Sequence, residues 1–370
     1  MKKLYKLFWG ICFIFGGIGV LERLIVGKKL LNLGSYVTWG LWVSLYIYLV
    51  GISSGAYLFS SLISFLGLKY FEKLKRLCLL ISLVALVSAL LTIVLDLGHW
   101  ERFWYVFVYP TPSSMMSWMV WLYSAYFLLV LLQIIYTFRD SEKKAHILAM
   151  IGLPLAIAIP VCGGSLFGVV GARPYWHSAM FPIIFLFEAL LSGMSLIALV
   201  SIIFGFTKQD DEGMFNILPR LILGLLIVNI TLEAAILVVP LWGQVAYHIE
   251  AVKLVLFGPF WWVFWLVHIG MGSVIPLFLL LEKPNLTKLS FASGLIALTF
   301  MSVRLNIVIP ALAIPELKGL ESAFIEKRLM FSYVPSFHEW QVSLFILSLA
   351  VGLFYLGIKF LPVLKTKTLK

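Results

Sequence analysis

The sequence predicts an all-α, polytopic membrane protein with about ten transmembrane helices, and its composition and its apolar runs both indicate this class. Of the 370 residues, 62% are hydrophobic and only 12% are charged, and the mean hydropathy is +1.03. Soluble proteins carry about 25% charged residues, so this protein has too little polar surface to face water on all sides. The composition therefore excludes a soluble enzyme.

Ten runs of about 20 apolar residues are each long enough to cross a hydrocarbon core of about 30 Å, at a helical rise of about 1.5 Å per residue. The runs at 36–66 and 179–205 are long enough to tilt or protrude. The ten predicted spans are 7–24, 36–66, 77–97, 116–138, 146–167, 179–205, 217–239, 257–281, 289–309 and 340–362.

The first run resembles a signal peptide, because Lys2, Lys3 and Lys6 precede it. Glu22 and Arg23 follow it, however, without a small-residue cleavage site. We therefore expect this run to be a retained first helix.

The basic residues indicate the orientation. An even number of spans places both termini on one side of the membrane, and most of the 28 Lys and Arg residues then fall on that side. The positive-inside rule predicts that both termini are cytoplasmic. We interpret the net charge of +11 as a topology signal and not as a surface for nucleic acid.

Small residues and prolines occur inside several spans. Small residues let helices approach closely, and prolines kink helices and free backbone carbonyls. We expect close packing at Gly51, Gly55, Gly164, Gly168, Ser192 and Gly193, and kinks at Pro154, Pro160 and Pro276.

Metal and haem ligands are scarce. Cys12, Cys78 and Cys162 are isolated, without the spacing of a zinc or iron–sulfur site. A bis-histidine haem requires two facing imidazoles, and only His268 lies deep in a span. We expect no metal, no haem and no iron–sulfur cluster in this protein.

Four segments on the non-terminal side are long and aromatic, whereas connectors in helical bundles usually run two to eight residues. They are interpreted as a docking surface, as amphipathic helices at the membrane interface, or as both. These segments are His99 to Ser117, Arg173 to Ser178, Pro240 to Pro259 and Pro310 to Glu339.

An acid, an imidazole and a guanidinium follow one another at the outer end of span 77–97. They are Asp96, His99 and Arg102. An ionisable group near hydrocarbon is costly, so each one is a functional candidate. The alternative is a helix cap with an interfacial ion pair.

Three further ionisable groups lie inside spans. Glu188 is roughly 14 Å inward from Ala179 at helical rise, close to the midplane. Glu233 and Arg304 lie near the outer ends of their spans and are expected to meet as a buried pair. This pair has either a proton-transfer or a purely structural role.

His268 sits near the middle of span 257–281, beside Trp261, Trp262 and Trp265. It is either a proton-transfer group or a histidine hydrogen-bonded inside a bundle. The charged groups together predict a polar pocket that opens outward. Such a pocket suits a hydrophobic molecule that gains or loses protons.

The string DLGHWERFWYVFVYPTPSSMMSWMVW, Asp96 to Trp121, resembles the DLGxPxRFW…P.PSSPMSW signature of the NrfD/PsrC family. These are the quinone-interacting membrane subunits of polysulfide reductase-type complexes. WGLWVSLYIYLVGISSGAYLFS, Trp39 to Ser60, looks like the first bundle helix of that family. RLNIVIPAL, Arg304 to Leu312, and SYVPSFHEWQVS, Ser332 to Ser343, resemble the ten-helix HybB/DsrP branch.

The resemblance implies a single integral membrane domain over 1–370, with two four-helix bundles at about 36–167 and 179–309. The helices at 7–24 and 340–362 would be peripheral. It also implies the inner (cytoplasmic) membrane of a prokaryote, with lipid, a ferredoxin-like iron–sulfur subunit and a catalytic subunit as partners. No nucleic acid is expected.

For the site, the resemblance implies quinone binding near the outer face, with menaquinone the expected cofactor. The residues expected to bind it are Asp96, His99, Arg102, Trp118 and Ser54. The residues expected to form a proton route or a buried ion pair are Glu188, Glu233, Arg304 and His268.

Two other functions remain open. One is a proton- or ion-translocating subunit without quinone, and the other is a passive anchor whose outer segments hold a redox partner. The sequence does not indicate the catalytic partner, the direction of the quinone chemistry, the quinone species or whether protons are pumped.

Overall fold

The computed structural model describes residues 2–207, 212–243, 246–283, 285–317, 319–323 and 326–363, and every regular element in these ranges is helical. Ten helical stretches within them are long and apolar enough to cross a membrane. This confirms the predicted all-α class and the predicted number of spans. Residues 244–245, 318 and 324–325, in two of the long outer segments, lie outside the described ranges.

The principal helices correspond to the predicted spans. They are α1 (Lys2–Val26), α2 (Leu41–Leu66), α3 (Lys75–Asp96), α5 (Met115–Phe138), α6 (Glu142–Gly168), α7 (Met180–Ile203), α8 (Glu212–Gly243), the π-helix η4 (Val263–Val274) followed by α10 (Ile275–Leu281), α11 (Leu286–Thr299) followed by α12 (Met301–Leu312), and α14 (Phe337–Phe360). Short helices occupy the connections: η1 (Gly27–Leu30), η2 (Lys69–Leu74), η3 (Trp100–Arg102), α4 (Tyr105–Val108), α9 (Ala246–Phe257), α13 (Leu320–Ala323) and η5 (Lys327–Leu329).

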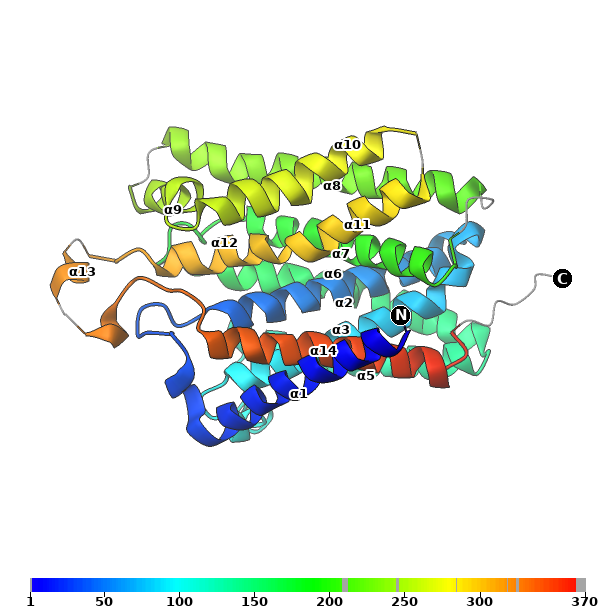
Figure 1. Ribbon diagram of the computed structural model, residues 1–370, viewed down its shortest axis with the longest axis horizontal. Coiled ribbons are helices and arrows are strands. Elements are labelled where there is room, and N and C mark those ends of the chain that lie inside the picture. The colour runs from blue at the N-terminus through cyan, green and yellow to red at the C-terminus, as the bar shows by residue number, and fades with distance from the viewer. Residues whose placement is uncertain are drawn as a thin grey trace.

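The long helices run side by side along the long axis of the molecule (Figure 1). We call the end that carries α9 and α13 the loop end, and the opposite end the terminal end. The helix α1 begins, and α14 finishes, toward the terminal end. The loop end corresponds to the side that the sequence predicts to face outward.

The helix α2 is the centre of the packing, in contact with α3, α6, α7 and α12. Glycine allows its backbone to touch that of α7. A Cβ atom on Gly55 would lie 1.8 Å from the carbonyl oxygen of Ala189, and one on Gly193 would lie 2.7 Å from the amide nitrogen of Ala56. The close packing expected at Gly55 and Gly193 therefore occurs where α2 meets α7.

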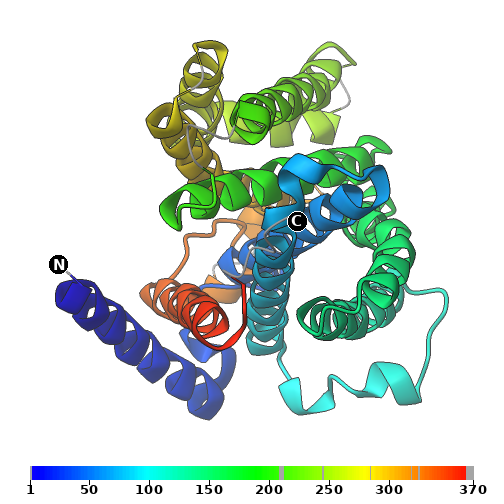
Figure 2. The same cartoon turned by 90° about the vertical axis from the view of Figure 1, so that its right-hand side faces the viewer.

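The first and last helices lie side by side at the edge of the molecule (Figure 2). Trp9 Nε1 donates to the carbonyl of Ser348 over 2.8 Å, and Gln341 Nε2 donates to the carbonyl of Phe15, also over 2.8 Å. The helix α14 packs in turn against α3 and α2. Most of the remaining surface of α1 is apolar and exposed, as expected of a helix that faces lipid.

The span predicted at 257–281 is not a simple α-helix, because its first part is the π-helix η4. Pro276 follows directly. Proline lacks an amide hydrogen and clashes with the carbonyl four residues earlier, here that of Gly272, and the wider π turn relieves this conflict. Stretches of π-helix are rare and often occur at functional sites. By contrast, α6 continues through Pro154 and Pro160.

Candidate functional site

Glu188 on α7 and Arg304 on α12 form a buried ion pair in the second half of the protein. Arg304 Nη1 lies 2.6 Å from Glu188 Oε2, and the two side chains are 4% and 3% exposed. The guanidinium carbon also lies 3.8 Å from the ring centroid of Phe185. The helix α2 also passes close to this arginine, because a Cβ atom on Gly51 would lie 3.9 Å from Arg304 Nη2.

Glu233 on α8 forms a second buried pair with His268 on η4. His268 Nε2 lies 2.6 Å from Glu233 Oε2, and Asn229 Nδ2 donates to Glu233 Oε1 over 2.6 Å. Gly272 brings η4 against α11, because a Cβ atom there would lie 2.4 Å from Thr299 Oγ1. This close packing fixes the helix that carries His268.

The two pairs form one electrostatic unit, which we call the charged cluster: Glu188, Glu233, His268 and Arg304. The charges of Glu233 and His268 act on Glu188, and both carboxylates act on Arg304. Two carboxylates and one guanidinium leave one negative charge, which a single additional proton neutralises. The cluster can therefore hold one exchangeable proton inside the hydrocarbon region, where an unbalanced charge is costly.

A small cavity, the cluster cavity, adjoins these side chains. It is lined by Glu188, Glu233 and His268 together with apolar residues such as Phe264 and Ile307, and the space in it is about 40 Å³. A water molecule requires about 10–15 Å³ on this measure. The cavity therefore has room for a few water molecules, and a quinone ring would not enter without side-chain movement.

The pairing within the charged cluster differs from the prediction. The sequence placed Glu233 opposite Arg304, whereas Arg304 pairs with Glu188, and Glu233 pairs with His268. Residue counting gives only the position of a side chain along its span. The partner depends on which face of each helix the side chain occupies, and spans that are apolar all round carry little information about that.

The predicted series Asp96, His99 and Arg102 is not brought together as one site. Asp96 is 6% exposed and faces η1, with Lys28 Nζ 3.7 Å from its Oδ2. His99 and Arg102 lie in the exposed loop and both approach Glu101, at 3.0 Å and 3.8 Å. A hydrogen bond from the backbone and one from His99 lower the pKa of Glu101.

Trp118 and Ser54 lie in different environments. Trp118, at the start of α5, is 47% exposed, donates from Nε1 to the carbonyl of Pro112, and packs edge to face against Trp121. Ser54 is fully buried and donates to the carbonyl of Gly51. It lies about 20 Å along α2 from the loop end at helical rise, so it is at the depth of the charged cluster and far from Asp96.

A quinone head group needs hydrogen-bond donors for its oxygens and flat apolar walls. The exposed loop supplies the donors, which are the imidazole of His99 and the guanidinium of Arg102. These side chains are accessible, being 68% and 58% exposed. The exposed indole rings of Trp100 and Trp104 lie in the same loop, and that of Trp118 follows at the start of α5. No group of three or more His, Cys, Asp or Glu side chains suited to a metal ion occurs among the described residues.

Sequence reasoning missed several residues of this architecture. Asn229 supports Glu233, and Tyr175 lines the cluster cavity. Arg23, which is 3% exposed, donates to the carbonyls of Leu95 and Leu97 at the end of α3. The available signal was position: Asn229 lies one helical turn before Glu233, and Arg23 is a charge at the end of an apolar run.

Comparison with known proteins places this sequence in a family. Residues 29–316 match the family described as "Polysulphide reductase, NrfD", and the protein belongs to this family. It is 32% identical to a selenate reductase subunit of Mesobacillus selenatarsenatis, over 98% of this sequence and 95% of that relative. It is 28% identical to the Hdr-like menaquinol oxidoreductase integral membrane subunit of Archaeoglobus fulgidus, over 89% of this sequence and 85% of the relative.

A more distant relative is a polysulfide reductase polypeptide of Wolinella succinogenes, which is 25% identical over 72% of this sequence and 90% of its own length. Family membership agrees with the resemblance seen in the sequence motifs. Together with the ten apolar helices among the described residues, it identifies a multi-pass membrane protein.

Proposed function

We propose that this protein is the quinone-interacting integral membrane subunit of a multi-subunit oxidoreductase. In this role it exchanges electrons between menaquinone in the membrane and an iron–sulfur partner subunit at the loop end, which faces outward from a prokaryotic inner membrane. The observation that carries the proposal is the similarity, over most of its length, to a selenate reductase subunit and to a menaquinol oxidoreductase integral membrane subunit. The catalytic subunit belongs to the same complex.

The quinone, when bound, supplies the two-electron chemistry, and the residues of this protein hold and orient it. His99 and Arg102 would donate hydrogen bonds to its oxygens, and Trp118 would contribute an apolar ring face. Asp96 would act on this site indirectly, because its carboxylate contacts Lys28 and not the quinone. It would act through the loop that follows it. Ser54 would act from the interior, at the depth of the charged cluster.

The proposal is tested on the intact complex in proteoliposomes, with menaquinol-dependent reduction of the acceptor of the catalytic subunit as the readout. Arg102→Gln removes a charge-assisted hydrogen bond, which contributes about 1.5–3 kcal/mol, and should weaken menaquinol binding about tenfold or more. Asp96→Asn should abolish menaquinol-coupled turnover while the complex still assembles. The control is Arg139→Gln, an exposed arginine at the terminal end of α5.

Fluorescence quenching of a menaquinone analogue measures binding separately from turnover. Wild-type turnover and analogue binding in both Asp96→Asn and Arg102→Gln would exclude the proposed quinone site. Electron transfer that needs no quinone would instead favour a passive anchor.

A second candidate function, proton transfer, is favoured by the charged cluster. Its one exchangeable proton lies beside a cavity with room for water, so Glu188, Glu233, Arg304 and His268 would take up or release protons during quinone chemistry. Glu233→Gln should then slow proton release, recorded with a pH dye inside the vesicles. Analogue binding at the loop should stay unchanged.

A further inference from the structure

Two cavities of the molecule meet at one side chain. The first is the cluster cavity, and the second, which we call the end pocket, lies at the loop end between residues 172–175 and the end of α12 and has a volume of about 130 Å³. Among the described residues, Tyr175 is the one that lines both cavities. Its side chain is buried, so it forms the partition between the end pocket and the charged cluster.

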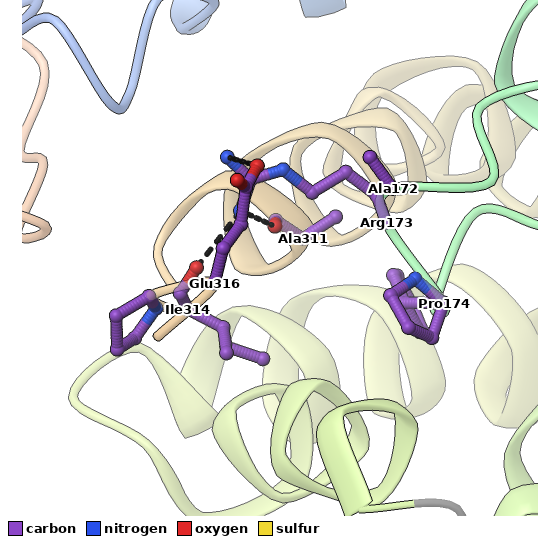
Figure 3. Close-up of a pocket in the computed structure, with 8 residues that line it drawn as sticks. Ala172, Arg173, Pro174, Ala311, Ile314 and Glu316 are labelled. Carbon is purple, nitrogen blue, oxygen red and sulfur yellow. Dashed lines mark hydrogen bonds and ion pairs between the residues drawn. The ribbon is translucent and has the colours of Figure 1, made fainter. Parts of the chain in front are cut away.

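Arg173 builds the wall of the end pocket (Figure 3). Its Nη1 donates to the carbonyls of Ala311 and Ile314 over 3.2 Å and 2.8 Å, and its Nη2 lies 3.2 Å from Glu316 Oε1. The Glu316 side chain is 57% exposed. The pocket therefore has a charged rim that is in contact with water at the loop end.

Tyr175 is held mainly by the backbone and rings of its neighbours. Its hydroxyl donates to the carbonyl of Asn306 over 3.3 Å, and its ring packs edge to face against Phe181 and His248. Burial, together with the negative charges of Glu233 and Glu188, raises the pKa of the Tyr175 hydroxyl. The phenol thus lies within electrostatic reach of the cluster, and rotation of one side chain would connect the two cavities.

Some residues that line the cluster cavity carry buried polar atoms without a hydrogen-bond partner in the described part of the protein. Glu188 Oε1, His268 Nδ1 and Asn306 Nδ2 are buried and have no hydrogen-bond partner among the described residues. Buried polar groups of folded proteins are almost always paired with protein or with ordered water. Lipid tails cannot pair with these atoms, whereas a few water molecules fit the volume of the cavity.

We propose that the end pocket and the cluster cavity form one water path, interrupted by the ring of Tyr175, through which water and protons reach the charged cluster from the loop end. Tyr175 is then the residue that sets the rate of this access. The path does not depend on quinone binding, so it can exist even if the proposed function fails.

The test is the accessibility of a cysteine placed in the cluster cavity. Ile184→Cys puts a thiol on the cavity wall, one helical turn before Glu188, in a full-length protein that also carries Cys12→Ser. The probe is a charged, membrane-impermeant methanethiosulfonate, applied to oriented proteoliposomes from either side. We expect slow labelling from the loop end with Tyr175 present, at least tenfold faster labelling in Tyr175→Ala, and no labelling from the terminal end.

Matched controls separate the path from general loosening of the fold. Tyr175→Phe keeps the ring and loses only the bond to Asn306, so labelling should stay slow. Ala149→Cys, in a fully buried position on α6 outside both cavities, should stay unlabelled in either background. Tyr175→Leu repeats the test if the alanine variant does not fold.

Ala172→Phe provides a second measurement, because it fills the end pocket and should slow labelling of Ile184→Cys even in Tyr175→Ala. Equal labelling rates with and without the Tyr175 ring would overturn the proposal. Labelling from the terminal end would also overturn it, as would rapid labelling that only a lipid-soluble maleimide achieves, which would indicate entry through the membrane.

Discussion

Arg304 is central to the charge balance of the charged cluster. It is the only guanidinium among the four cluster residues, and carboxylates on two different helices, Glu188 and Glu233, interact with its charge. The pair it forms with Glu188 is nearly inaccessible to solvent. Breaking a buried ion pair by removing one partner leaves the other charge uncompensated, and that loss exceeds what the intact pair contributes.

We therefore expect Arg304→Gln to lower stability by about 3–5 kcal/mol. The measurement is thermal unfolding in detergent, followed by size-exclusion chromatography with fluorescence detection. Glu188→Gln together with Arg304→Gln should recover part of the loss, because neither charge then remains unpaired. Arg304→Gln with the thermal stability of the wild type would show that the pair is not buried in the membrane protein.

Arg23 is a second buried arginine, and it lies at the edge of the molecule on α1. Its two bonds to the carbonyls at the end of α3 place a cation at the negative end of that helix, which is favourable. Arg23→Gln should therefore loosen α1, with faster trypsin cleavage after Lys28 or Lys29. Lys6→Gln, an exposed basic residue on the same helix, is the control and should leave cleavage unchanged. Equal cleavage of both variants would mean that Arg23 does not hold α1.

At the scale of helices, the crossing of α2 and α7 depends on glycine. A Cβ atom on Gly55 would meet the backbone carbonyl of Ala189 at 1.8 Å, and a backbone atom cannot move aside as a side-chain tip can. Gly224, on α8, has nothing within 4 Å of the same position. The two glycines are thus a matched pair.

Gly55→Ala should separate the two helices and lower the unfolding temperature by several degrees, whereas Gly224→Ala should leave it unchanged or raise it slightly, because alanine favours helix by about 1 kcal/mol. Both effects are measured by the same thermal assay. A Gly55→Ala variant as stable as Gly224→Ala would mean that the helices cross elsewhere.

The sequence predicted the helices better than the site. The helical spans follow from the length of apolar runs, because hydrocarbon demands about 20 such residues with internally paired backbones. The π-helix was not predictable in detail, although Pro276 indicated a disturbance there. The partner of Arg304 and the direction of Asp96 depend on rotation about helix axes, and in uniformly apolar helices no polar face records that rotation.

At the scale of the whole molecule, the polar features of the candidate sites lie toward one end. The charged cluster, Tyr175 and the end pocket all belong to the half of the molecule toward the loop end. At the terminal end many of the charged groups are exposed, as Arg139 and Asp140 are. Charge in this membrane protein is therefore distributed unevenly along the membrane normal.

The positive-inside rule predicts that the terminal end lies in the cytoplasm. A green fluorescent protein fused after residue 370 should fluoresce, and alkaline phosphatase fused there should be inactive. Alkaline phosphatase inserted in the loop between α3 and α5 should be active, since that loop would face outward. The opposite pattern in these fusions would reverse the orientation and place the end pocket on the cytoplasmic side.

The pairing of α1 with α14 has a consequence for biosynthesis. The helix α1 leaves the ribosome well before its main partner α14 has been made, so α1 must wait in the bilayer while the helices between them are inserted. During that interval Arg23 and Lys28 can dock on α3 as soon as α3 is inserted. Insertion of α14 then becomes the event that completes this edge of the molecule, and a product terminated before α14 would be left with an unpaired α1.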